Sequence, residues 1–132
     1  MIVVRGNDSG AQSELRGPTF TGDVWAAPVL PATDGVVIND IVFTPGAHTF
    51  WHSHEHGQIL QITAGEGFVC ADGAAPVLVR AGDTVWTPPG ERHWHGATPH
   101  SILSHTAISL GSTHWAEEVS DSDYHSVTKD TP

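Results

Sequence analysis

The sequence predicts an all-β fold, a jelly-roll barrel with a short helical segment near the C-terminus. Three observations carry this prediction. The chain has 14 glycines and 9 prolines among 132 residues. Short apolar or alternating runs lie between these turn-forming residues, which is typical of sandwiches and barrels. Residues 20–110 contain no stretch with convincing helical periodicity.

The expected elements follow the chain in order. The polar segment Asn7–Arg16 precedes the first strand, and residues 1–18 are expected to be mobile. Ser120-Asp121-Ser122-Asp123 is expected to cap a short helix through Tyr124, and residues 126–132 to be mobile again. The seven runs predicted as strands are Val24–Leu30, Val36–Phe43, Gln58–Thr63, Gly67–Cys70, Val77–Arg80, Thr84–Thr87 and Ser101–Leu110.

The length and the two glycine-led blocks that begin at Gly46 and Gly82 indicate one domain built from two related halves. We expect a single domain over residues 1–132 with its core at about residues 20–112. No linker and no helix-turn-helix segment is recognisable, which argues against a transcriptional regulator with a sensing barrel.

Charge and cysteine content limit the partners. A net charge of −10, from 15 acidic and 5 basic residues, argues against nucleic acid, which requires a basic surface, and against an anionic membrane. The apolar run before Arg5 is too short for a signal peptide or a membrane span. Cys70 is the one cysteine and cannot form an internal disulfide. We therefore expect a cytoplasmic protein that binds a small molecule and forms a homodimer or higher homo-oligomer.

Four residues predict a metal site: His52, His54, Gln58 and His93. Residues i and i+2 of a strand point to the same face, so His52 and His54 can converge on one ion. The polar run that ends at Gly57 predicts a turn that ejects His56 and returns Gln58 to the site. His93 arrives from a separate strand, after the turn at residues 88–90.

These blocks resemble the two motifs of the cupin superfamily. They read Gly46-x5-His52-x-His54-x3-Gln58-x6-Gly65 and Gly82-x5-Pro88-x-Gly90-x2-His93. Gln58 stands where the family usually has Glu, and Ala97 stands where Asn is usual. The chain is most similar to the small bacterial cupins that act as manganese-dependent hydroxynitrile lyases, and this resemblance extends over most of its length. It implies a double-stranded β-helix and a divalent ion, Mn²⁺ ahead of Fe²⁺, Zn²⁺ or Ni²⁺.

Two further histidines, His95 and His105, have more than one interpretation. His95 shares a strand face with His93, whereas the alternation of residues 101–110 leaves either face of that strand free to point inward. Both could equally be hydrogen-bonded core histidines; the resemblance implies a place in the cavity. It also implies a substrate wall that includes Asn39, Ile41, Thr49 and Ser109.

The remaining histidines and the tryptophans are read as structural. His48, His56, His100, His114 and His125 are expected at the surface, Cys70 in the core, and Trp51, Trp86 and Trp94 in the barrel wall or a subunit contact.

Three functions are open. The first is a carbon–carbon lyase that cleaves or forms cyanohydrins, with His105 as general base and His95 as a second proton-transfer or orienting group. Four neutral ligands leave an ion with its full 2+ charge, which suits Lewis-acid chemistry and keeps nearby imidazoles neutral. The second is an oxygen-dependent enzyme, a dioxygenase or oxidative cleavage enzyme acting on a small apolar or aromatic substrate. The third is a non-catalytic barrel that binds one small molecule.

Overall fold

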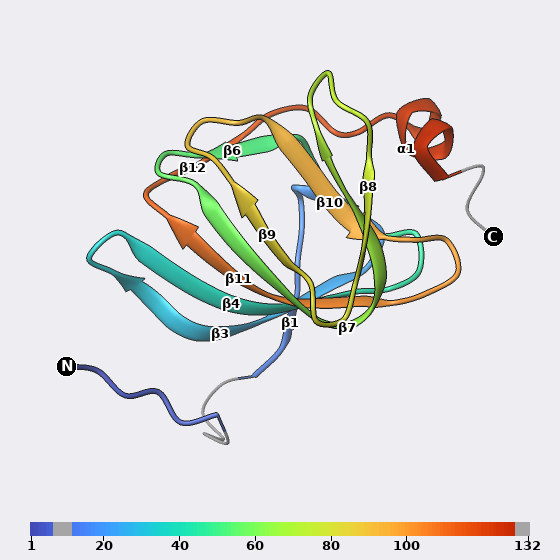
Figure 1. Ribbon diagram of the computed structural model, residues 1–132. Coiled ribbons are helices and arrows are strands. Elements are labelled where there is room, and N and C mark those ends of the chain that lie inside the picture. Colours follow the sequence, from blue (N-terminus) through green and yellow to red (C-terminus); the bar gives the residue numbers. More distant parts are fainter. Residues whose placement is uncertain (7–11, 129–132) are drawn as a thin grey trace.

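An antiparallel β-sheet curls into a barrel, and a helix follows its last strand (Figure 1). The computed structural model describes residues 1–6 and 12–128, and the predictions that fall on residues 7–11 and 129–132 lie outside this part. Within it, the prediction of an all-β jelly-roll barrel with a short C-terminal helix is confirmed. The elements are β1 (Glu14–Leu15), β2 (Phe20–Thr21), β3 (Val24–Thr33), β4 (Val36–Phe43), β5 (His48–Thr49), β6 (His52–His54), β7 (Gln58–Ala71), β8 (Val77–Arg80), β9 (Thr84–Thr87), β10 (His93–Ala97), β11 (Leu103–Leu110), β12 (Thr113–Trp115) and α1 (Asp121–Thr128).

The strand order explains how the barrel closes. Hydrogen-bonded neighbours follow the order β1-β3-β4-β11-β7-β10-β5-β2, with β6 and β12 beyond β10 and with β8 and β9 both on β7. The first part of β7, up to Gly65, pairs with β11 and β9, and the second part pairs with β10 and β8. One strand therefore belongs to both layers, as at the corners of orthogonally packed sheets.

Gly65 makes this corner possible. Its φ is +77°, a conformation that L side chains rarely adopt. A Cβ atom at this position would lie 1.8 Å from the carbonyl oxygen of Ile102 on the approach to β11. Only glycine allows β7 to turn from one layer to the other against that neighbour.

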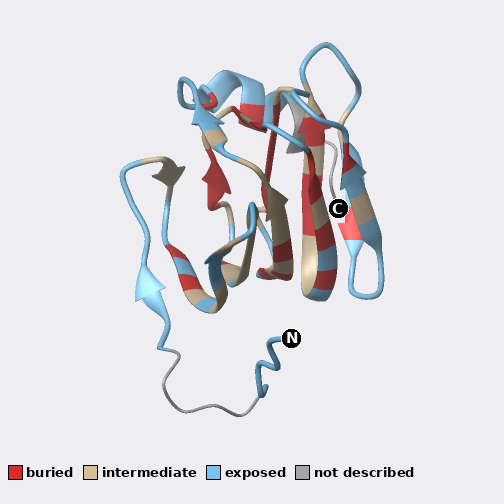
Figure 2. Cartoon of the chain, turned by 90° about the vertical axis from the view of Figure 1, so that its left-hand side faces the viewer, coloured by how far each residue is buried: buried red, intermediate tan, exposed pale blue. Residues whose placement is uncertain are grey.

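Two groups of buried side chains hold the fold together. The larger lies between the strands of the barrel and contains Val24, Phe43, Ala47, Leu60, Ile62, Val79, Ala97, Leu103 and Ala107. The smaller lies between the second layer and α1 and contains Phe68, Cys70, Trp94, Val119 and Tyr124. Figure 2 shows these buried positions along the strands, while the loops and the N-terminal segment are exposed.

Three predicted strands have exact bounds, and the others differ at one or both ends. β4, β8 and β9 match residue for residue, and α1 runs to Thr128, beyond the predicted end at Tyr124. Its cap is as predicted, because the backbone N–H of Asp123 donates to the Ser120 hydroxyl oxygen at 3.1 Å. The strands predicted at 58–63 and 67–70 are one strand, β7. Glu14 and Leu15, within the segment predicted to be mobile, pair with β3.

The prediction of a surface His48 is wrong. The residue is 3% exposed, because α1 covers the outer side of β5. Its ring stacks on Tyr124 with centroids 4.4 Å apart, and its Nδ1 lies 2.9 Å from the carbonyl oxygen of Gly46. His56, His100, His114 and His125 are exposed, and Cys70 is buried, as expected.

The three tryptophans occupy different environments. Trp94 is buried beneath α1, and Trp51 is half-buried under the guanidinium of Arg92, which lies 4.6 Å from its ring centroid. Trp86 is 54% exposed.

Candidate metal centre and cavity

The three histidines predicted as ligands converge from two neighbouring strands. His52 on β6 pairs directly with His93 on β10, so their side chains lie on the same face. Their ring centroids are 4.3 Å apart. His54, two residues along β6, lies with its ring centroid 5.0 Å from that of His52 and 5.5 Å from that of His93.

In each of these histidines, a neighbouring oxygen atom lies within hydrogen-bond distance of Nδ1. Nδ1 lies 2.8 Å from the carbonyl oxygen of Phe50 in His52, 2.9 Å from that of Glu91 in His93, and 3.1 Å from the hydroxyl oxygen of Thr113 in His54. A carbonyl only accepts, so the proton of His52 and of His93 is on Nδ1 and the Nε2 lone pair is free. Such outer partners are what orient metal-binding histidines.

Gln58 returns to the site as predicted. The turn through Gly57, which has φ +97°, leaves the His56 side chain 68% exposed and buries Gln58 to 3% exposure. The Gln58 Nε2 amide donates to the Ser109 hydroxyl oxygen at 3.0 Å. Its Oε1 therefore faces the ligand histidines and lies 3.3 Å from Nε2 of His93.

This donor set fits a divalent transition-metal ion. It offers three imidazole nitrogens and one amide oxygen, all neutral and all oriented by neighbours. Among the described residues, the buried Nε2 of His54 has no hydrogen-bond partner, and an unsatisfied buried nitrogen is costly unless a ligand takes it. Ring nitrogens of His52, His93 and His95 also lie within 4.8 Å of one another, so His95 lies next to the same candidate metal position.

Burial sets the protonation of the cluster. Desolvation, followed by the neighbouring His93, lowers the pKa of His52 well below its usual value and that of His54 to about 4. Desolvation also lowers the pKa of His93, although its bond to the Glu91 carbonyl opposes this. All three imidazoles are therefore neutral at pH 7 and can accept a metal ion without first losing a proton.

His95 and His105 form a pair behind the ligands. His105 Nε2 and His95 Nδ1 are 3.1 Å apart. Both rings are fully buried, and desolvation is the main cause that lowers the pKa of His95 well below its usual value and that of His105 to about 4. His95 also borders the open cavity, whereas His105 is not among the residues that line it. The inner face of β11 is thus the one that carries His105.

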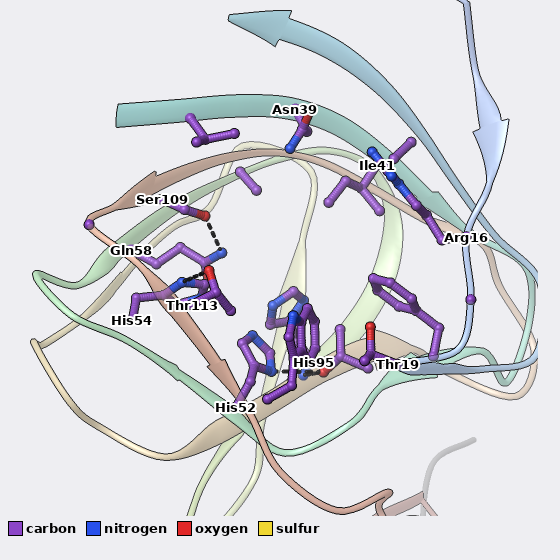
Figure 3. A pocket seen from close by; sticks show the side chains of 18 residues that line it. Arg16, Thr19, Asn39, Ile41, His52, His54, Gln58, His95, Ser109 and Thr113 are labelled. Atoms are coloured by element: carbon purple, nitrogen blue, oxygen red, sulfur yellow. Dashed lines mark hydrogen bonds between the residues drawn. The ribbon is translucent and has the colours of Figure 1, made fainter. Parts of the chain in front are cut away.

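The cavity in front of the histidines has a volume of about 280 Å³. All four residues expected in the substrate wall line it, as Figure 3 shows for Asn39, Ile41 and Ser109. Sequence reasoning missed part of the wall, including Arg16, Thr19, Phe20, Thr113 and Trp115. The alternation of β12 would have indicated Thr113 and Trp115, but the N-terminal segment gave no signal.

The described part of the chain contains no helix long and apolar enough to cross a membrane.

Comparisons with known proteins agree with this geometry. The family model described as "Cupin domain" matches residues 39–105. The chain is 40% identical over 123 residues to a protein named (R)-mandelonitrile lyase from Granulicella tundricola, a match that covers 87% of this chain and 94% of that one. A cupin-like protein from Thermotoga maritima superposes with a TM-score of 0.82 at 33% identity, over 99% of this chain and 98% of that one.

A more distant structure shares the fold alone. The polyketide cyclase RemF from Streptomyces resistomycificus has a TM-score of 0.73 at 17% identity, over 94% of this chain and 92% of its own. One barrel therefore carries different chemistries, and activity has to be argued from the site. The matched motif, the barrel and the relatives together show that this chain belongs to the cupin domain family.

Proposed function

We propose that the protein is a metal-dependent hydroxynitrile lyase, which splits a cyanohydrin into an aldehyde and hydrogen cyanide. The observation that carries this proposal is a neutral ligand set beside a second, neutral histidine pair that borders a small cavity. The identity to a protein named (R)-mandelonitrile lyase supports it. His52, His54, Gln58 and His93 would hold the ion, which supplies Lewis acidity to an oxygen or cyanide ligand.

The histidine pair supplies the proton transfer. With the His95 Nδ1–H donated to His105 Nε2, the other nitrogen of His95 is a free acceptor beside the ligand cluster. It takes the substrate hydroxyl proton, the C–CN bond breaks, the electron pair leaves with cyanide, and the protonated His95 gives this proton to the cyanide, which leaves as hydrogen cyanide. The geometry favours His95 as the base in contact with substrate and His105 as the residue that fixes its tautomer, the reverse of the sequence-based expectation.

The cavity holds the rest of the substrate. Ile41, Phe20 and Ala107 present apolar surface, and Thr49 connects the wall to the histidines. Its hydroxyl oxygen lies 3.4 Å from His52 Nδ1 and accepts the backbone N–H of His95 at 3.2 Å. A compact aromatic or aliphatic group fits this lining better than a sugar, which needs many polar contacts.

The test is cleavage of mandelonitrile by protein stripped of metal and reloaded with Mn(II), without oxygen, with benzaldehyde followed by absorbance. We expect turnover that disappears with a chelator and returns with metal. Absence of turnover by protein with a confirmed full complement of metal would refute the proposal. Oxygen consumption with Fe(II) or Mn(II) would then favour the dioxygenase, and its absence the simple binding protein.

We also propose manganese as the ion, a homodimer as the assembly and the cytoplasm as the location. Manganese rests on the family resemblance, because the ligands alone accept Zn, Ni or Cu at least as well. The dimer is consistent with Leu15 and Trp25, which are 55% and 42% exposed on paired strands at one edge of the sheet. Metal analysis of protein purified without chelator and light scattering of the eluted protein test the first two.

A further inference from the structure

The charge of the cavity is opposite to that of the whole chain. The chain has 15 acidic and 5 basic residues, yet no aspartate or glutamate is among the described residues that line the cavity, and one arginine, Arg16, is. The proposed ion would add a 2+ charge that none of its ligands neutralises. The carboxylates of this acidic protein are therefore absent from the described lining of the cavity, where they would contact the ligand.

The backbone places Arg16 at this wall. Its N–H donates to the carbonyl oxygen of Val24 at 2.7 Å, directly after β1. In β1, Leu15 pairs with Trp25 and both are exposed, whereas Glu14 pairs with Ala26, which lines the cavity. Residues two apart share a face, so Arg16 is on the side of Glu14 and Ala26. Figure 3 shows its side chain beside Ile41, reaching over the cavity.

Across residues 1–6 and 12–128, the guanidinium of Arg16 has no ion pair and no side-chain hydrogen bond, so no described residue competes with a ligand for it. The other two arginines of the barrel are engaged on the outer surface, Arg80 with Glu66 and Arg92 with Asp72 and Glu117. The planar fork of N–H donors in a guanidinium can bind a carboxylate through two parallel hydrogen bonds.

We propose that the ligand for which this cavity is built carries a carboxylate that Arg16 binds, at a distance from the group that reacts at the histidines. Building on the proposed lyase, its substrate is a cyanohydrin with a carboxylate on its apolar part. Ile41 and Phe20 line the same cavity as Arg16 and the histidines, and their apolar surface would take the body of such a molecule.

The experiment compares mandelonitrile with its 3-carboxy and 4-carboxy derivatives on the metal-loaded wild type, on Arg16→Gln and on Arg80→Gln. Arg80 is the matched control, since its ion pair with Glu66 lies on the outer surface. We expect at least one carboxylated substrate to lose about tenfold or more in kcat/KM in Arg16→Gln, the size of one charge-assisted hydrogen bond. The ratio of kcat/KM for that carboxylated substrate to kcat/KM for mandelonitrile should fall in Arg16→Gln and stay at the wild-type value in Arg80→Gln.

A binding measurement separates this inference from the lyase proposal. Calorimetry with 3- and 4-carboxybenzaldehyde and with benzaldehyde, on metal-loaded and metal-free protein, should show preference for a carboxylated aldehyde that Arg16→Gln removes. That result supports the inference even where no cyanohydrin is cleaved. If the preference for the carboxylated aldehyde survives Arg16→Gln, the carboxylate binds to the metal and not to Arg16. If Arg16→Gln weakens the binding of charged and neutral aldehydes equally, Arg16 has no role in carboxylate recognition. Either outcome overturns it.

Discussion

In the proposed mechanism, the contact between His105 Nε2 and His95 Nδ1, at 3.1 Å, gives the two residues separate roles. His95 borders the cavity and the ligand cluster, while His105 is not among the residues that line the cavity. A base needs a free lone pair toward its substrate, and a second imidazole behind it keeps the correct nitrogen protonated. The same division appears in the ligands, where Thr113 and two backbone carbonyls hold the nitrogens that face away from the centre.

His95→Ala is expected to lower kcat by about 10²–10⁴-fold, the usual contribution of a positioned base. His105→Ala should lower kcat strongly but less, at unchanged metal content, and should move the acidic limb of the pH–rate profile because His95 loses its partner. Metal analysis and the pH dependence of kcat check both. Undiminished turnover of His105→Ala would remove it from the mechanism, and loss of metal would make its role structural.

In the proposed metal centre, Gln58 would determine the formal charge of the site. We expect Gln58→Glu to bind metal more tightly and to cleave cyanohydrin more slowly, since a carboxylate lowers the formal charge of the site from 2+ to 1+. Competition with a coloured chelator gives the affinity, and initial rates give the activity. Ser109→Ala, which removes the 3.0 Å partner of the Gln58 amide without adding charge, is the control. A Glu variant as active as wild type would contradict this role of charge.

At the scale of elements, the strands bounded by turn residues on both sides were predictable and the others were not. β4, β8 and β9 are short apolar runs between glycine, proline or aspartate residues, so the sequence defines their ends. The sequence of β7 predicts two strands because Gly65 interrupts the apolar pattern. The strand continues across the corner because Gly65 packs against the chain next to β11, and this contact between distant segments is not visible in a local sequence pattern. β1 and β2 are two residues long and carry no periodicity at all.

In the candidate site too, residues that join through pairing or packing of distant segments were missed. The ligand spacing predicted His52, His54, Gln58 and His93 together, because strand geometry is local. Arg16 was missed because it joins the cavity only through pairing of β1 with β3. The burial of His48 was missed because it depends on α1, which packs against it from the far end of the chain.

Gly65→Ala tests the corner in β7. The new methyl group would lie 1.8 Å from a carbonyl oxygen, so we expect a loss of about 3 kcal/mol or more, or failure to fold. Gly73→Ala is matched to it, having the same φ of +77° and open space around the added Cβ. It should cost only about 1–2 kcal/mol, the strain of that conformation. Urea unfolding measures both, and equal losses would show that the contact with Ile102 is unimportant.

At the scale of the whole molecule, the buried histidines make metal-free protein sensitive to acid. Burial lowers the pKa of His54 and His105 from 6.5 to about 4. Between these values, the two histidines are protonated in the unfolded chain and remain neutral in the folded protein. Stability from these groups is complete above 6.5 and falls as the pH drops toward 4. For His105 alone the loss at pH 4 is about 3 kcal/mol.

The free energy of unfolding from urea titrations between pH 7 and pH 4 checks this expectation. It should decline steadily for metal-free protein, and bound metal should raise it at neutral pH because the ion binds only the folded state. A flat profile over this range in metal-free protein would mean that these histidines titrate normally and that the site is open to water.

The pairing of β6 with strands far along the chain has a consequence for biosynthesis. Gln58 meets His93 across 35 residues, and His54 meets Thr113 across 59. While a ribosome is still making the first half, His52 and His54 have neither the strand beside them nor the hydroxyl that orients them. The proposed ion would therefore meet its complete ligand set only after nearly the whole barrel has been synthesised and closed. Its identity would then depend on the metals in the compartment of folding, so heterologous expression in cells of different metal content should yield differently loaded protein.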